Sequence, residues 1–257
     1  MKLSVAIATY NEEKNIGRCL ASIADWVSEI VVVDGSSADR TPDIAREYKA
    51  RVIKTDNPPI FHINKQKAID ECKGDWILQL DADEIVTPQL KDEILAKINQ
   101  KSEINGYWLP RKNFFLGRFL KKGGQYPDYT MRLYKKGKGK LPCKSVHEQA
   151  VIEGKVDYLK NPLEHYPYAS FSHYIDHFNR YTDLIAQELN DQKIPTGFSS
   201  FLKYMIFLPK LWFLKTFLRH KGFEDGFAGF VFSLFSSLRF PTSYIKYWES
   251  KRQKISL

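Results

Sequence analysis

Hydrophobic and polar residues follow two different periods in the first hundred residues. Nearly continuous apolar runs at 3–8 and 30–33 are typical of buried strands, and the second run consists of β-branched residues. Between the two runs, Ile16, Leu20 and Ile23 recur at helical spacing. Strand and helix patterns that follow one another in this way predict an α/β fold, with a mostly parallel sheet flanked by helices.

The pattern changes twice further along the chain. Short strand-like pieces separated by Gly, Pro and Lys come first, as in antiparallel additions to a sheet or in a substrate-facing region. Helical spacing follows, and one stripe at i, i+3, i+4, i+7, i+8 and i+11 comprises Phe227, Phe230, Val231, Leu234, Phe235 and Leu238. We therefore expect a domain at 1–168, with halves at 1–104 and 105–168, and an amphipathic helical extension at 169–257.

Three carboxylates, Asp81, Asp83 and Glu84, directly follow an apolar run at 76–80. An unpaired carboxylate away from water is costly, so a cluster at the end of a buried strand requires a partner. Mg²⁺ and Mn²⁺ are natural partners because they favour carboxylate oxygens and share them with substrate phosphates. The alternative is a solvated turn before the next helix, which is the usual setting of an isolated Asp-x-Asp pair.

Polar residues also follow two earlier strand-like runs. Asp34 ends the second run, and the first is followed by Thr9, Tyr10, Asn11 and Glu12. Because ligands of open parallel sheets bind outside the carboxyl ends of the strands, these positions predict a nucleotide site. In this hypothesis Asp34 accepts from the N–H of a uracil-like base, Tyr10 stacks on the base and Asp81 reaches the ribose. Each residue alone is equally typical of a turn or helix cap, and the sequence has no glycine-rich dinucleotide or P-loop motif.

The net charge of +9 indicates an anionic partner: a nucleic acid, a phosphorylated substrate or an anionic membrane surface. From Ser199 onward, ten Lys or Arg oppose three acidic residues and interleave with Phe, Trp and Leu. Such a segment is typical of interfacial membrane binding. A helical subdomain that packs its apolar stripe on the main domain explains the same pattern, and the sequence leaves both interpretations open.

Cysteine usage and the N-terminus indicate a compartment. Cys19, Cys72 and Cys143 are too far apart in sequence for a zinc motif and cannot all pair, which favours a reduced cytoplasmic setting. The chain begins with a strand-like run rather than a signal peptide, and no apolar stretch reaches the roughly 18 residues of a membrane-spanning helix. We expect a protein of the cytoplasm.

Three motifs together carry a resemblance to a known family. The stretches ATYNEE, VVVDGSSADRT and LDADE resemble the family 2 glycosyltransferases, which are inverting enzymes with the Rossmann-like GT-A nucleotide-sugar fold. Further on, MRLY, VHE and GFEDG resemble a branch that includes bacterial lipopolysaccharide inner-core β-1,4-glucosyltransferases. Two positions depart from these patterns: Gly35 stands where many relatives have a second Asp, and Glu224 stands where the branch has Leu.

The resemblance implies an enzyme that transfers a hexose, glucose from UDP-glucose, to a lipid-linked saccharide such as the lipopolysaccharide inner core. It implies a Mg²⁺ or Mn²⁺ ion held by Asp83 with help from Asp81 and His147, and a general base at Glu148 or, alternatively, Asp128. The implied residues for nucleotide-sugar binding are Thr9, Tyr10, Asn11, Glu12, Asp34, Lys65, Asp81, Ala82, Asp83 and Arg132. The 1–104 half would bind the nucleotide, and the 105–168 half would face the acceptor.

Three other functions stay open from the sequence. A transferase of the same fold can build capsule or exopolysaccharide precursors. A non-catalytic basic protein would instead bind nucleic acid or anionic membrane. A metal-dependent nucleotidyltransferase is the third alternative. We expect the transferase, with no nucleic acid partner, peripheral on the cytoplasmic face of the inner membrane, where its basic aromatic C-terminus would contact anionic lipid.

Overall fold

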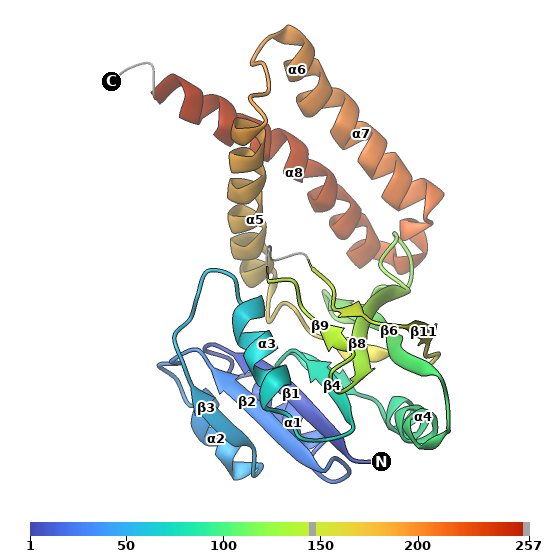
Figure 1. Cartoon of the computed structure of the whole chain (residues 1–257). Coiled ribbons are helices and arrows are strands. Elements are labelled where there is room, and N and C mark those ends of the chain that lie inside the picture. Colours follow the sequence, from blue (N-terminus) through green and yellow to red (C-terminus); the bar gives the residue numbers. More distant parts are fainter. Residues whose placement is uncertain (144–147, 254–257) are drawn as a thin grey trace. The chain divides into compact units, whose positions relative to one another are not determined.

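The structure is a computed structural model and describes residues 1–143 and 148–253. The chain forms two compact units (Figure 1). The sheet unit comprises Met1–Lys112 and Asp128–His165, and the helical unit comprises Asn113–Pro127 and Tyr166–Leu257. Residues 113–127 thus group with the helical unit, although they lie within the stretch expected to face the acceptor.

Four parallel strands form the first half of the sheet. Their order is β3 (Arg51–Lys54), β2 (Glu29–Asp34), β1 (Leu3–Thr9) and β4 (Trp76–Leu80). β1, β2 and β4 are buried on both faces, which is why their sequences are nearly continuous in apolar residues. The register places Thr9 opposite Asp34 on one side of β1 and Ile7 opposite Leu80 on the other.

Further strands extend the sheet beyond β4. The order continues with β8 (Asp128–Lys135), β6 (Ile104–Phe115), β12 (Leu163–His165) and β5 (Glu84–Val86). Shorter strands complete the set: β7 (Arg118–Phe119) and β11 (Lys155–Tyr158) pair with β6, and β9 (Gly139–Lys140) pairs with β10 (Val151–Ile152). Beyond β4 the sheet is thus extended by antiparallel pairs such as β4–β8 and β8–β6, and by one parallel pair, β6–β11. The predicted α/β fold, a mostly parallel sheet with antiparallel additions and flanking helices, is confirmed.

Helices cover both faces of the parallel half: α1 (Ile16–Ala21), α2 (Thr41–Glu47), α3 (His62–Glu71) and α4 (Pro88–Asn99). Alternate residues of β1 face opposite helices: Val5 and Ile7 share a core with α1 and α4, and Ala6 packs with residues of α3. α4 starts at Pro88, after the hydroxyl of Thr87 accepts from the N–H of Leu90 at 3.2 Å.

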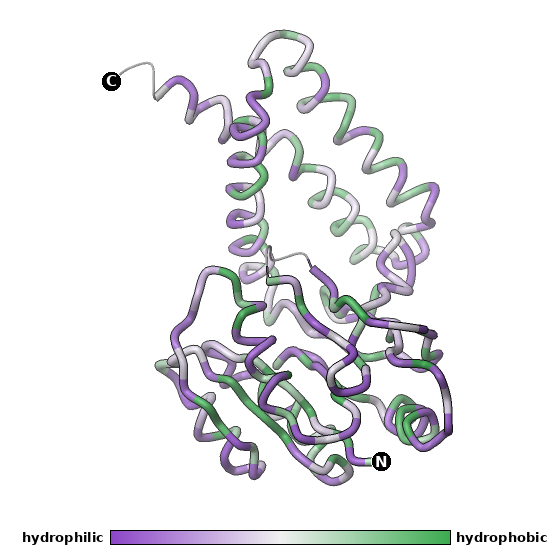
Figure 2. The backbone as a smooth tube through the Cα atoms, in the orientation of Figure 1, coloured by the Kyte–Doolittle hydropathy of each residue, from purple (hydrophilic) through white to green (hydrophobic). Residues whose placement is uncertain are grey.

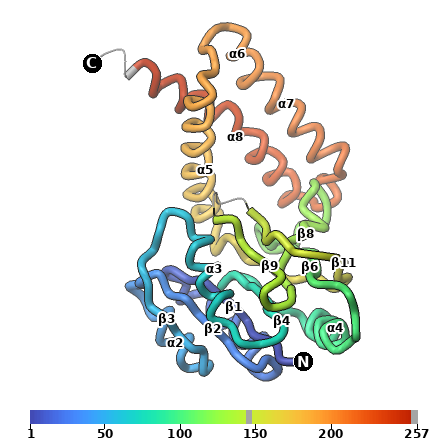
Figure 3. The backbone as a smooth tube through the Cα atoms, viewed as in Figure 1, coloured from blue at the N-terminus to red at the C-terminus, as the bar shows by residue number. Residues whose placement is uncertain are grey.

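The helical unit contains α5 (Phe171–Asp191), α6 (Phe198–Leu202), α7 (Leu208–Phe213) and α8 (Gly226–Gln253). Two π-helical turns, η1 (Lys203–Phe207) and η2 (Leu214–Arg219), continue α6 and α7, and a 3₁₀ turn, η3 (Gly222–Asp225), precedes α8. α8 packs against α5 and α7, and Figure 3 follows the chain through these elements in order. In the part of the chain that the structure describes, no helix has both the length and the apolar character to cross a bilayer.

The apolar stripe of α8 divides between core and solvent. Val231 is buried beside Phe115 and Tyr174 in a core of the helical unit, whereas Phe227 is 77 % exposed and Phe230 is also exposed. One helix face cannot both pack fully and remain accessible, so the stripe serves internal packing and also contributes exposed apolar surface. Figure 2 shows hydrophobic positions that recur between hydrophilic ones along α6 and α7.

The GFEDG stretch organises the start of α8. The buried carboxylate of Asp225 accepts from the backbone N–H of Lys121 at 2.9 Å and of Lys122 at 2.7 Å. The backbone of η3 also approaches α8 closely, because a Cβ atom on Gly229 would lie 2.0 Å from the carbonyl oxygen of Gly222. This stretch therefore ties residues 113–127 to the rest of the helical unit.

Gly229→Ala is expected to lower the free energy of unfolding by about 3 kcal/mol, because the added methyl group collides with backbone that cannot move without distorting η3. Urea unfolding followed by circular dichroism measures the change. Gly17→Ala is the matched control, since its Cβ would meet Ile44 at an ordinary 3.7 Å and alanine favours the helix by up to about 1 kcal/mol. Equal stability of Gly229→Ala and the wild type would contradict this account of the contact.

Candidate functional site

The ends of β1 and β2 meet through a buried carboxylate. The hydroxyl of Thr9 donates to Asp34 at 3.3 Å, and the hydroxyl and backbone N–H of Ser37 donate to the same carboxylate at 2.6 and 2.9 Å. Asp34 and Thr9 are both buried. The carboxylate of Asp34 is therefore held in one orientation at the edge of the sheet, as the register of parallel strands leads one to expect.

The loop after β1 lies beside the loop after β2. The N–H of Asn11 donates to the hydroxyl of Ser37 at 2.8 Å, and its side-chain oxygen accepts from the N–H of Ala38 at 2.9 Å. Asn11 has φ of 56°, a left-handed conformation that Asn tolerates better than most residues. The ring of Tyr10 is 48 % exposed beside this ordered loop, so it is accessible to a stacking partner.

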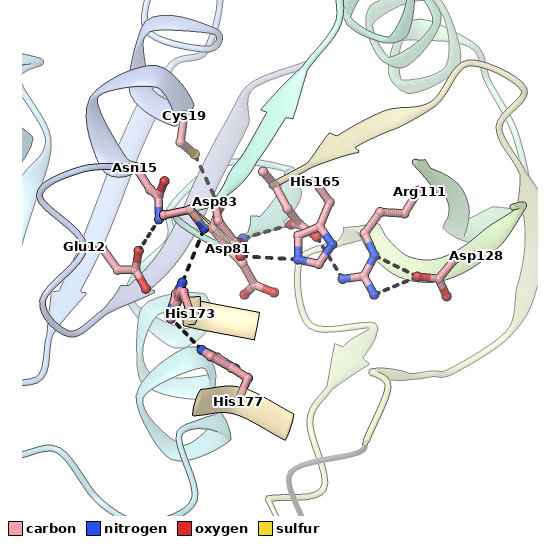
Figure 4. A network of polar contacts seen from close by, with 12 residues as sticks. Glu12, Asn15, Cys19, Asp81, Asp83, Arg111, Asp128, His165, His173 and His177 are labelled. Carbon is pink, nitrogen blue, oxygen red and sulfur yellow. Dashed lines mark hydrogen bonds and ion pairs between the residues drawn. The ribbon is translucent and has the colours of Figure 1, made fainter. Parts of the chain in front are cut away.

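Glu12, in the loop after β1, has a carboxylate near those of Asp81 and Asp83 after β4. Its carboxylate accepts from the side-chain amide of Asn15 at 2.9 Å, as Figure 4 shows. Burial raises the pKa of Glu12, and the nearby negative charges of Asp83 and Asp81 raise it further. The sequence motifs that follow β1 and β4 thus contribute to a single negative region.

Asp81 directly follows β4 and is paired with two buried cations. Its carboxylate forms ion pairs with Lys65 of α3 and Arg132 of β8. Burial opposes ionisation of Asp81, but Arg132 and Lys65 together hold the pKa of its carboxyl well below the ordinary value of 3.8. Three residues that the resemblance implies for nucleotide-sugar binding, Lys65, Asp81 and Arg132, therefore converge from segments that are distant in sequence.

A second carboxylate, that of Glu84, shares Arg132 with Asp81. Glu84 is fully buried, and it contacts Arg132 at 2.8 Å and Arg111 at 3.4 Å. Arg111 also donates from Nε and Nη2 to one oxygen of Asp128, at 3.0 and 2.7 Å (Figure 4). Asp128, the alternative candidate for the general base, is therefore held by a guanidinium.

Asp83 has a different partner, the imidazole of His165. Nε2 of His165 lies 3.3 Å from Oδ2 of Asp83, and Figure 4 shows the ring directed at this carboxylate. Burial opposes ionisation of Asp83, but the hydrogen bond and charge of His165 lower its pKa. The adjacent Ala82 is buried in the core, which fixes the backbone between the two aspartates.

Sequence reasoning did not find His165. It ends β12, an antiparallel partner of β5 in which His165 lies opposite Glu84. No local motif marks this histidine, and the pairing that brings it to Asp83 spans some eighty residues of the chain. The histidine that was predicted as a metal ligand, His147, lies outside the described residues.

A polar cavity of about 280 Å³ adjoins Asp81 in the sheet unit. Its lining brings together four predicted site residues, Lys65, Asp81, Arg132 and Glu148. The complete lining is Phe61, His62, Lys65, Gln79, Asp81, Arg111, Thr130, Met131, Arg132, Leu141, Glu148, Gln149 and Ala150. The cavity therefore joins Asp81, at the end of β4, to the region expected to face an acceptor.

Four buried polar atoms of this lining lack a hydrogen-bond partner among the residues that the structure describes, and one of them, Oδ1 of Asp81, has the ion pair with Lys65 instead. The other three are Nδ1 of His62, Oγ1 of Thr130 and Nε of Arg132. Buried polar groups are nearly always hydrogen-bonded, so these three atoms require water or a polar ligand in the cavity. Burial and the charge of Lys65 lower the pKa of His62, which favours the neutral ring. A hydroxyl-rich ligand would satisfy both donor and acceptor atoms of this lining.

Two side chains of the site, those of Asp83 and His165, can be compared with the ligands that a divalent cation needs. Within residues 1–143 and 148–253, no three His, Cys, Asp or Glu side chains gather as a ready metal cluster. Asp83 and His165 nevertheless offer an oxygen and a nitrogen donor side by side. Mg²⁺ and Mn²⁺ often use one or two protein carboxylates and complete their shell with water and substrate phosphates, so this pair fits such an ion.

Known proteins that resemble this chain include glycosyltransferases. The sequence model of the family described as Glycosyl transferase family 2 matches residues 4–159. The chain is 28% identical over 241 residues to the lipopolysaccharide core biosynthesis glycosyltransferase LpsC of Rhizobium meliloti, covering 90% of this chain and 86% of the relative. It is 31% identical over 255 residues to a glycosyltransferase of Rickettsia typhi, covering 93% of this chain and 84% of the relative.

Among solved structures, the crystal structure of S. aureus TarS is similar in fold. The TM-score is 0.50 with 22% sequence identity, and the match covers 88% of this chain and 46% of that protein. Similarity at this level of identity concerns the fold, and it extends over both the sheet and the helices that follow it.

Proposed function

The chain belongs to glycosyltransferase family 2, and from this premise we propose that it is a metal-dependent inverting hexosyltransferase. Its donor would be UDP-glucose, and its acceptor a lipid-linked saccharide such as the lipopolysaccharide inner core. The observation that carries the proposal is the convergence of Asp81, Lys65 and Arg132 beside the Asp83–His165 pair. Carboxylates can hold a metal ion and accept from hydroxyl groups, and cations can bind phosphate oxygens. A site that contains both therefore suits a ligand with a metal-bound diphosphate and hydroxyl groups.

The strand ends would bind the nucleotide. In this proposal Asp34, whose carboxylate is held by Thr9 and Ser37, would accept from a base N–H. The exposed Tyr10 would stack on the base, and a ribose hydroxyl would replace part of the contacts of Asp81. Arg132 and Lys65 would then turn from Asp81 toward the phosphate oxygens, for which guanidinium and ammonium groups are suited. Thr9 at the end of β1 and the loop residues Asn11, Glu12 and Ala82 would support this site through their contacts and backbone.

The divalent cation would be held by Asp83 and His165, with Asp81 close by. When bound, such an ion supplies positive charge that neutralises the leaving diphosphate. His165 orients the carboxylate of Asp83 and is itself a donor group for Mn²⁺. Asp83 and His165 therefore have the ligand atoms that a divalent cation requires, and substitution of Asp83 tests the assignment.

Glu148 is our choice for the general base. Its side chain lines the same cavity as Asp81 and Arg132, so an acceptor hydroxyl in this cavity would lie within its reach. The carboxylate would take the hydroxyl proton while the oxygen attacks the anomeric carbon from the face opposite the diphosphate. The new C–O bond forms as the bond to the diphosphate oxygen breaks, and the configuration inverts. Asp128, held by Arg111, remains the alternative base.

The acceptor assignment draws on the similarity to a lipopolysaccharide core biosynthesis glycosyltransferase over most of both chains. An acceptor with a lipid anchor requires an enzyme that reaches the membrane surface. Exposed apolar side chains on α6–α8 and the surrounding cations support a peripheral location on anionic membrane, on the cytoplasmic face of the inner membrane. Capsule or exopolysaccharide precursors are the alternative acceptors for the same chemistry.

UDP with Mn²⁺ is expected to raise the melting temperature, whereas a DNA oligonucleotide is not. At about 100 times the dissociation constant, a ligand that binds only the folded state contributes about 2.7 kcal/mol. That corresponds to a rise of roughly 5–10 °C for a chain of this size. Differential scanning fluorimetry measures the shift, and a panel of nucleotide sugars assayed for product identifies the donor. Stabilisation by DNA alone, with no response to UDP and Mn²⁺, would favour the non-catalytic basic protein.

Vesicle flotation tests the membrane location. Binding to vesicles that contain phosphatidylglycerol is expected at about 0.1 M salt and is expected to weaken strongly at about 1 M, because the Debye length falls from about 10 to 3 Å. Vesicles of phosphatidylcholine alone provide the uncharged comparison. Equal flotation with both lipids at both salt concentrations would contradict an electrostatic contribution from the basic residues.

A further inference from the structure

The segment 203–219 of the helical unit, which comprises η1, α7 and η2, presents one regular face to solvent. Its exposed residues lie in two rows, and within each row the residues are four positions apart. The first row comprises residues 203, 207, 211, 215 and 219, and the second comprises residues 206, 210, 214 and 218. All other residues of the segment are buried or partly buried. The two rows therefore form one stripe along a continuous helical stretch, which is called the exposed stripe below (Figure 1).

The two π-helical turns explain why the spacing is four. In an α-helix with 3.6 residues per turn, a residue four positions along has rotated about 40° beyond a full turn. From Lys203 to Arg219 this rotation would add up to about 160° and would carry the row to the packed side of the helix. A π-helical turn closes its hydrogen bonds over five residues and therefore winds more slowly. η1 and η2 thus keep residues that are four positions apart on one face.

Only two kinds of side chain occupy the exposed stripe. The apolar ones are 39–61 % exposed and comprise Ile206, Phe207, Leu211, Leu214 and Leu218. The others are cations: Lys203, Lys210, Lys215 and Arg219. None of these cations has a salt bridge within the part of the chain that the structure describes. The sequence has no acidic residue from 192 to 223, so the exposed stripe combines apolar surface with uncompensated positive charge.

The opposite face of the same segment packs against α8. The ring of Tyr204 stacks on that of Tyr244, with centroids 5.3 Å apart, and the indole N–H of Trp212 donates to the hydroxyl of Ser236 at 3.2 Å. Thr216 is buried on this side. The segment is therefore attached to the helical unit through one face, and its apolar stripe is left in water because the other face already supplies the packing.

We propose that the exposed stripe is the membrane contact of this protein and lies flat on an anionic bilayer, with its apolar side chains below the headgroups and its cations at the lipid phosphates. An amphipathic helix that lies in the plane of a membrane buries its apolar face about 5–10 Å into the boundary between headgroups and acyl chains. Lys and Arg beside that face reach the headgroups while their stems cover apolar surface. The proposal rests on the membrane association proposed above and assigns it to one helix face. It does not depend on the donor sugar or the catalytic base.

Two other occupants are less complementary to the exposed stripe. A nucleic acid would bring phosphates to the cations but would leave the apolar side chains without an apolar contact. A second copy of this chain, packed through the same stripe, would place like charges opposite one another, and the stripe has no acidic residue to compensate them. A bilayer that contains anionic lipid is complementary to both the apolar side chains and the cations.

The first test substitutes an exposed leucine in the full-length protein. Leu211→Glu is expected to weaken binding to vesicles that contain phosphatidylglycerol by at least about tenfold, because an apolar side chain is lost from the bilayer and a negative charge is added. Leu184→Glu is the matched control, since Leu184 is 47 % exposed on α5, outside the exposed stripe. It should float with the vesicles as the wild type does. Both variants should keep the wild-type thermal response to UDP and Mn²⁺, which shows that they are folded.

The second test removes charge and leaves the apolar side chains in place. The double variant Lys210→Gln/Arg219→Gln is expected to bind the same vesicles about thirtyfold more weakly, from about 1 kcal/mol for each basic residue near an anionic surface. Its binding to vesicles of phosphatidylcholine alone should equal that of the wild type. Lys54→Gln/Lys101→Gln is the matched control, because it removes two exposed lysines of the sheet unit and should float like the wild type.

Several outcomes would overturn the proposal. If the wild type floats and Leu211→Glu floats as well as Leu184→Glu, the membrane association stands but its contact lies on another face. Equal flotation of the two double variants would remove the cations from the contact. If the wild type itself does not float, the association is wrong, whereas the response to UDP and Mn²⁺ tests the transferase independently. A wild-type dimer that Leu211→Glu converts to a monomer in sedimentation would assign the exposed stripe to a second copy. Binding of a DNA oligonucleotide that Lys210→Gln/Arg219→Gln abolishes would assign it to nucleic acid.

Discussion

Asp83→Asn is expected to lower Mn²⁺-dependent hexose transfer about a thousandfold, which corresponds to about 4 kcal/mol of transition-state stabilisation. Asparagine keeps the size of the side chain and a hydrogen-bonding oxygen for His165, but it loses the charge that a divalent cation requires. The readouts are the transfer rate as a function of Mn²⁺ concentration and the melting temperature without ligand. The rate should fall and its metal dependence should weaken, while the melting temperature stays near that of the wild type.

Asp25→Asn controls for the loss of one negative charge. Asp25 is an exposed aspartate that pairs with Lys91 at 3.0 Å in the sheet unit. Surface pairs of this kind contribute about 0–1 kcal/mol, so neither activity nor stability should change much. An Asp83→Asn enzyme that kept full activity and an unchanged response to Mn²⁺ would refute the metal assignment of Asp83.

Arg132→Met is expected to lower the free energy of unfolding by about 3–5 kcal/mol, the range for breaking a buried ion pair from one side. Methionine is similar in length and apolar, but it leaves the fully buried Glu84 with Arg111 at 3.4 Å as its remaining cation contact. Denaturant unfolding measures the loss. Arg40→Met is the matched control, because Arg40 pairs with Glu47 on the surface and should contribute less than about 1 kcal/mol.

The same variant should unfold at a less acidic pH. In the wild type the pKa of Asp81 lies below its ordinary value of 3.8, because Arg132 and Lys65 outweigh the opposing effect of burial. The corresponding stabilisation is present above about pH 4 and is lost as pH falls through the lower, folded-state pKa. Removal of Arg132 brings the folded-state pKa of Asp81 closer to its unfolded value, so acid unfolding should begin at a higher pH. An unchanged acid transition would contradict the proposed coupling between these residues.

Local patterns in the sequence were sufficient to predict the parallel half of the sheet. Strands with continuous Val and Ile runs bury both faces, and the helix after Thr87 has its cap and proline in consecutive positions, so each element is specified by neighbours in the chain. The carboxylates after β4 follow from the same logic, since parallel strands with short connections bring their carboxyl ends to one edge. The α/β fold and the acidic edge of the sheet could therefore be predicted before any coordinates.

Contacts between distant segments required the three-dimensional structure. His165 reaches Asp83 through an antiparallel pairing of β12 with β5, and Arg111 and Arg132 reach Glu84 from two other strands. Nothing near these residues in sequence indicates their partners, because pairing register depends on loop closure and packing over many residues. The division of the α8 stripe between core and solvent likewise depends on contacts with segments that are distant in sequence. Periodicity says which residues share a face of a helix, and packing against other elements says whether that face is covered.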